Sequence, residues 1–169
     1  MFGVTSASFL QGPEGVAQQL ATLAGITGTP VTSTTAAFQR ALGHLGISRV
    51  SLASIYHRDG SQPFVDRLAE AGVETVGRHD FDAGSDREVA TWGAGQIIDL
   101  VMRSLAPDAQ AVVVPETALH TAGLGSVLDA AAGRPVLTAT QVSLWDAYRL
   151  AGVSPLATAA GGLVAKHRS

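Results

Sequence analysis

The chain has 169 residues, of which 46% are hydrophobic and only 15% charged, and its net charge is −3. This balance supports a sizeable buried core, and the lack of a Lys/Arg cluster argues against partners such as nucleic acid or an anionic membrane. The absence of cysteines excludes disulfides, thiolate chemistry and Cys-type metal sites. Without a recognisable leader or a long apolar run, the chain is expected to be cytoplasmic.

The first part of the chain, residues 1–45, opens with a stretch rich in Gly, Ser and Thr. A helix is expected over residues 14–24 and a short extended run over residues 30–32. The first clear helix covers residues 34–45, where apolar side chains recur at helical spacing. Hydroxyl residues before it can cap its start, and the glycine after it can adopt the left-handed conformation that ends a helix.

Four strand–helix repeats follow between residues 47 and 152. The expected strands are 49–54, 73–76, 111–114 and 135–138, and the expected helices are 63–71, 95–105, 124–132 and 141–151. Pro63 is placed at the first position of its helix, which tolerates proline. Because strands alternate with helices, the pattern predicts an α/β fold with a parallel four-stranded sheet flanked by helices. Residues 154–169 are rich in small residues, and both a final helix and a loose tail remain open there.

Hydroxyl side chains dominate the positions that follow the predicted strands. Ligands of open α/β sheets bind beyond the carboxyl ends of the strands, so these positions are the candidate site. With backbone N–H groups at helix starts, the hydroxyls can form a cradle for a carboxylate. The alternative is that they are ordinary helix caps and turn residues. The residues concerned lie in segments 5–8, 32–35, 54–56, 115–117 and 138–141.

Six segments together form a more specific pattern. Residues 3–10 read Gly-Val-Thr-Ser-Ala-Ser-Phe-Leu, residues 29–36 read Thr-Pro-Val-Thr-Ser-Thr-Thr-Ala, and residues 86–89 read Asp-Arg-Glu-Val. Residues 49–56 are a strand that ends in tyrosine, and residues 111–119 are a strand that leads into Pro-Glu-Thr-Ala-Leu. Residues 135–153 form a final strand–helix unit. In this order and spacing they resemble the motifs of the Asp/Glu racemase superfamily, which includes arylmalonate decarboxylases and maleate isomerases.

The resemblance implies two similar α/β domains with the site between them. Residues 46–153 would be one complete domain, and residues 1–45 part of a second, pseudo-equivalent one. The implied chemistry is cofactor-independent isomerisation, racemisation or decarboxylation of a small carboxylic or dicarboxylic acid. By position, the cradle for the carboxylate ligand would consist of Thr5, Ser6, Tyr56, Thr117 and Ala118.

The sequence departs from the superfamily at both thiol positions. Val4, at the first, is chemically inert, and Glu116 stands at the second. Glu116 can act as a general acid or base if it is buried, but its charge repels an anionic substrate. The alternative is an ordinary polar residue at the start of a loop. Two interpretations therefore stay open: an isomerase or decarboxylase that uses Glu116, and a catalytically inactive relative that binds carboxylates or serves an assembly.

The resemblance begins at the third residue, without the strands that the superfamily places before it. Either the chain start is misassigned, or the protein is a shortened relative, or another subunit covers the open edge. We therefore expect a homo-oligomer, or poor solubility, with apolar surface around Phe2, Phe9, Leu10 and Leu20.

The remaining candidates are two histidines near strand ends, His57 and His120. They are either acid/base or ligand-binding groups or exposed loop residues. No spacing of His, Asp and Glu suggests a metal site, and no glycine-rich nucleotide loop is present, so no cofactor is expected.

Overall fold

The computed structural model describes residues 1–153; residues 154–169, where a final helix or tail was expected, lie outside the described part. Its sheet contains the strands β1 (Arg49–Ser54), β2 (Glu74–Asp80), β3 (Ala111–Val114) and β4 (Val136–Thr138). All pairs are parallel, in the order β2-β1-β3-β4. The prediction of a parallel four-stranded sheet flanked by helices is thereby confirmed.

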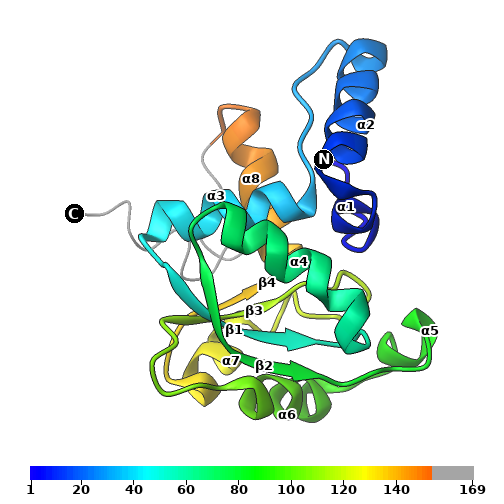
Figure 1. Cartoon of the computed structure of the whole chain (residues 1–169). Helices are drawn as coiled ribbons and strands as arrows, with labels where there is room; N and C mark the ends of the chain where they lie inside the picture. The colour runs from blue at the N-terminus through cyan, green and yellow to red at the C-terminus, as the bar shows by residue number, and fades with distance from the viewer. Residues whose placement is uncertain (154–169) are drawn as a thin grey trace.

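Helices cover both faces of this sheet (Figure 1). On one face, α3 (Thr34–Leu45), α4 (Arg58–Glu70) and α8 (Ala139–Leu150) enclose one apolar core. On the other, α6 (Ala94–Ser104) and α7 (Gly125–Ala132) enclose a second. Every residue of β3 is buried, as expected for a continuous apolar strand in the middle of a sheet. No helix in residues 1–153 is long and apolar enough to cross a membrane.

Three further helices complete the described part of the chain. The helix α2 (Gly12–Thr27) projects from the body of the molecule in Figure 1 and is longer than the expected 14–24. The short helices α1 (Ala7–Leu10) and α5 (Asp86–Val89) were not expected. The short extended run expected at 30–32 belongs to no strand of the sheet: the Thr32 carbonyl accepts from the Phe2 N–H at 2.8 Å, and the next residue, Ser33, makes an isolated parallel bridge with Phe2.

Helix α4 begins five residues earlier than predicted, so Pro63 lies inside it rather than at its first position. The start was missed because His57 caps the helix through Nδ1, which accepts from the Asp59 N–H at 3.3 Å, and histidine is not among the usual capping residues. The cap of α3 follows the common rule: the Ser33 hydroxyl accepts from the Ala36 N–H, and Gly46 ends the helix with a φ of 68°.

The expectation of an exposed Phe9 is wrong. Its side chain is 1% exposed and packs edge-on against Phe64, with ring centroids 5.6 Å apart. Phe64 in turn contacts Phe38 of α3, at 5.3 Å. Helices α1, α3 and α4 thus share one aromatic cluster above the sheet. The boundary proposed between residues 45 and 46 stays a prediction, and α3 contributes to the same core as β1 and α8.

Candidate functional site

Tyr56 and Glu116 meet beyond the carboxyl ends of the neighbouring strands β1 and β3. The Tyr56 hydroxyl donates a hydrogen bond to Oε2 of Glu116. The second carboxylate oxygen, Oε1, accepts from the backbone N–H of Ala118 at 2.5 Å. Glu116 is only 5% exposed. Its carboxyl group is therefore buried with a donor on each oxygen, so that its hydrogen-bonding needs are met inside the protein.

Hydroxyl side chains from the start of the chain complete this cluster. Thr5, which is buried, donates to the Thr117 hydroxyl at 3.4 Å. The Ser6 hydroxyl interacts with that of Tyr56. The Tyr56 ring is held edge-on against Phe9 of α1, with centroids 5.9 Å apart. The chain before α1 and the loop after β3 thus form two sides of one polar cluster, with Tyr56 between them.

Electrostatics keep Tyr56 in its neutral, donating form. Burial raises the pKa of the Tyr56 phenol, and the charge and hydrogen bond of Glu116 raise it further. The more distant charge of Asp86 adds to this, and the Ser6 interaction opposes it. At neutral pH the Tyr56 hydroxyl is therefore protonated and donates its hydrogen bond to Glu116.

Most of the sequence-predicted site residues come together here. Thr5, Ser6, Tyr56, Glu116 and Thr117 are linked by the contacts above, and Ala118 contributes its backbone N–H rather than its side chain. Val4 differs, because it is 50% exposed. The roles assigned to these residues remain proposals.

A cavity of about 380 Å³ adjoins the cluster and shares Thr117 with it. Its lining comes from the loop after β3 and the start of α8: Thr117, Leu119, His120, Thr121, Ala122, Gly123 and Thr140. The exposed His120 therefore lies beside the cluster. His57, in contrast, is taken up by the cap of α4 and by a contact with Asp59.

Several of the other strand-end hydroxyls have structural roles, but only some are the helix caps of the alternative interpretation. Thr138 caps α8 by accepting from the Gln141 N–H, and the Gln141 side chain bonds back to the Thr138 N–H at 3.2 Å. Ser8 and Thr35 bond each other at 2.6 Å. Thr32 donates to the carboxylate of Asp146 at 2.7 Å.

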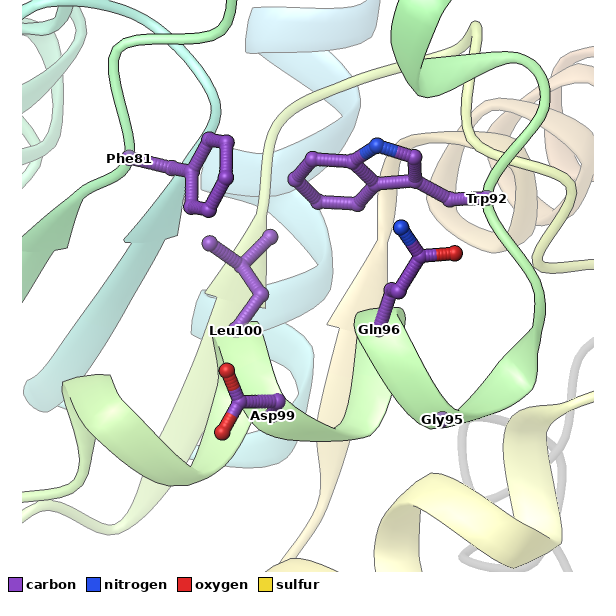
Figure 2. Close-up of a pocket in the computed structure, with 6 residues that line it drawn as sticks. All are labelled: Phe81, Trp92, Gly95, Gln96, Asp99 and Leu100. Atoms are coloured by element: carbon purple, nitrogen blue, oxygen red, sulfur yellow. The ribbon is translucent and has the colours of Figure 1, made fainter.

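A second pocket, of about 190 Å³, lies apart from this cluster and is formed largely by α6 (Figure 2). Phe81 and Trp92 meet edge-on above Leu100, with ring centroids 4.7 Å apart. Asp99 at its edge is paired with Arg103. The pocket contains none of the predicted site residues. Within residues 1–153, no group of three or more His, Asp or Glu side chains is arranged to hold a metal ion.

When the chain is compared with known protein families, residues 1–164 match the sequence model of arylmalonate decarboxylase. The arylmalonate decarboxylase of Bordetella bronchiseptica is 29% identical over 150 residues, which are 88% of this chain and 62% of that protein. The chain thus spans less than two thirds of that relative's length.

Solved structures show the same fold. A crystal structure of arylmalonate decarboxylase superposes with a TM-score of 0.83 at 27% identity, covering 96% of this chain and 73% of that one. The maleate isomerase of Pseudomonas putida S16, solved with maleate, superposes with a TM-score of 0.80 at 17% identity, covering 88% and 62%. The second similarity extends to the fold alone.

Proposed function

The chain belongs to the arylmalonate decarboxylase family, and from that premise we propose that it binds a small carboxylic or dicarboxylic acid at the Tyr56–Thr117 cluster, without the thiol-dependent turnover of the family. The family resemblance supplies the ligand class. The maleate isomerase with the same fold was solved with such an acid, maleate.

The observation that carries this proposal is the engagement of Glu116 at the second thiol position. Both of its oxygens accept hydrogen bonds, from Tyr56 and from the Ala118 N–H. A carboxylate is a far weaker nucleophile than a thiolate, and one held in this way has few lone pairs left to take a proton from a substrate. The exposed Val4 at the first thiol position has no acid/base group at all.

The donors proposed to hold the acid are neutral. Thr5, Ser6 and Thr117 offer hydroxyls, and Tyr56 offers a phenol that stays protonated at neutral pH. Hydroxyls and backbone N–H groups bind a carboxylate by directed hydrogen bonds and need no cationic side chain. The cluster therefore suits a small acid without a basic patch.

A second candidate function is family-type decarboxylation or isomerisation with Glu116 as the proton-transfer residue. It is favoured by the direct hydrogen bond between Tyr56 and Glu116 in a site where Glu116 is 5% exposed. A buried carboxylate beside a phenol can serve as an acid/base pair, and such catalysis typically contributes about 10²- to 10⁴-fold.

Binding is tested by calorimetric titration with malonate, maleate and aspartate. Thr5→Val, which removes a buried hydroxyl without changing its size, should weaken binding about tenfold or more, as expected for a lost hydrogen bond to a charged group. Thr22→Val, at an exposed position on α2, is the matched control and should leave binding unchanged. A folded protein that binds none of these acids contradicts the proposal.

Turnover is tested with wild type, Glu116→Gln and Glu116→Cys on a malonate-type acid, following CO₂ release or loss of optical purity. We expect wild type and Glu116→Gln to be silent, because neither thiol position carries a thiol; a gain of activity in Glu116→Cys would show that the rest of the site is competent. Brisk wild-type turnover that Glu116→Gln abolishes would establish the second candidate instead.

A further inference from the structure

Two of the groups proposed to hold a ligand's carboxylate are already occupied by a carboxylate of the protein. The Tyr56 hydroxyl and the Ala118 N–H both point at Glu116, one to each oxygen. The Glu116 carboxylate therefore occupies the buried position in which these two donors would bind the carboxylate of a ligand. An incoming carboxylate has to come to lie against that of Glu116 or displace it.

A second negative charge in this site would not be offset by an ion pair with Glu116. Among the described residues, Glu116 forms no ion pair, whereas the similarly buried Asp146 is paired with both Arg40 and Arg149. The surrounding elements carry Tyr56 after β1, the charged residues Asp86, Arg87 and Glu88 on α5, and His120 in the loop after β3. His57, next to Tyr56, contacts Asp59 instead.

Two carboxylates in one buried site are stable when they share a proton, because the neutral partner then donates a hydrogen bond to the charged one. We propose that Glu116 makes the site selective for an acid that arrives with a proton, which is then held between the ligand's carboxylate and that of Glu116. This inference rests on the proposed acid-binding function. No bond other than hydrogen bonds forms, and one proton is taken up from solvent for each acid bound at neutral pH.

The sign of the pH dependence follows from this stoichiometry. The complex holds one proton more than the free protein and free ligand, so binding strengthens as the pH falls and weakens about tenfold per pH unit as it rises. In Glu116→Gln the side chain keeps an acceptor oxygen and presents an amide N–H to the ligand, so no shared proton is needed. Free malonate ionises in the same way in both experiments, so its own ionisation cancels when the two proteins are compared.

The experiment is calorimetric titration of malonate into wild type and Glu116→Gln between about pH 6 and pH 8, in buffers of different ionisation enthalpy. We expect the ratio of the wild-type to the variant dissociation constant to rise about tenfold per pH unit. Wild type should take up one proton more per malonate than the variant. Glu74→Gln, the same change at an exposed position on β2, is the control and should behave as wild type.

Each other outcome overturns a specific step. Equal affinities with the same pH dependence show that Glu116 does not face the ligand. A constant ratio across the pH range shows that Glu116 swings away without sharing a proton. If neither protein binds malonate at any pH, the proposed acid-binding function itself fails. If Glu116→Gln does not fold, Glu116→Ser, which removes the same charge, is used in its place.

Discussion

The buried carboxylate of Asp146 offers the sharpest test of how α3 and α8 are joined. Its side chain is 0% exposed and accepts hydrogen bonds from the Thr32 hydroxyl, twice from Arg40 and once from Arg149, at 2.6–2.9 Å. We predict that Asp146→Asn, which keeps the shape but removes the charge, destabilises the protein far more than the same change at an exposed ion pair.

The size of this loss in stability depends on how far the carboxylate and the two arginines are exposed to solvent. Removing one partner of a fully buried ion pair costs about 3–5 kcal/mol. Arg40 and Arg149 are 39% and 44% exposed, so their guanidinium groups regain water when the charge of Asp146 is lost. The expected cost therefore falls to about 2–3 kcal/mol. For a chain of this size that corresponds to a melting temperature lowered by about 4–12 °C.

The effect depends on pH in a defined direction. Burial alone raises the pKa of Asp146, but the hydrogen bonds from Arg40, Thr32 and Arg149 outweigh it and hold the pKa below the ordinary value of 3.8. A carboxyl group with a lowered folded-state pKa stabilises the fold above its unfolded-state pKa. That stabilisation is lost as the pH falls from the ordinary value through the folded-state value. The difference between wild type and Asp146→Asn should therefore be largest near neutral pH and shrink below about pH 4.

The assay is urea unfolding at neutral and at acid pH, with the midpoint and slope fitted separately. Asp99→Asn is the matched control, because Asp99 also contacts an arginine at 2.7 Å but is 57% exposed. It should cost no more than about 1 kcal/mol. If Asp146→Asn proves as mild as this control, or if its cost persists at acid pH, the assignment of Asp146 as a charged link between α3 and α8 is wrong.

Three further predictions follow from local geometry. Gly77→Ala should cost about 1–3 kcal/mol in chemical unfolding, because a Cβ there comes within 2.5 Å of the Ser104 carbonyl oxygen and the Ser51 hydroxyl; Gly95→Ala, whose Cβ meets open space in α6, should be neutral or stabilising by up to about 1 kcal/mol. Ser33→Ala should lower the free energy of unfolding by about 1 kcal/mol through loss of the α3 cap, and an unchanged value would exclude that role. Light scattering should reveal a homo-oligomer, because Leu10 and Ile26 are 57% and 76% exposed on α1 and α2; a monodisperse monomer would contradict this.

Local pattern was sufficient where one element's own residues decide its structure. The continuous apolar run of β3 predicted both its bounds and its central position, and the helical spacing in α3, followed by Gly46, predicted its ends. The pattern failed where a residue acts outside its usual role, as His57 does in capping α4. It also failed for Phe9, whose burial depends on Phe64, far along the chain.

The site was predictable in place but not in detail. The rule that ligands bind at the carboxyl ends of parallel strands brings Tyr56 and Glu116 to one edge, because their strands are neighbours. Whether Glu116 faces Tyr56 or solvent depends on side-chain packing, which periodicity does not encode. The link between Arg40 and Asp146 joins residues 106 positions apart, and no local signal marked it.

The buried carboxylates of Asp146 and Glu116 accept hydrogen bonds from different kinds of donor. This difference determines how each is expected to respond to pH. Asp146 is surrounded by cations, so its charge is part of the fold and changes only when the pH becomes strongly acid. Glu116 is held by neutral donors alone, a phenol and a backbone N–H. If an acid binds as proposed, a proton shared between the two carboxylates lets these neutral donors stay in place beside both. The residue that replaces the family's second thiol, Glu116, is thus the one on which proton-linked acid binding is proposed to depend.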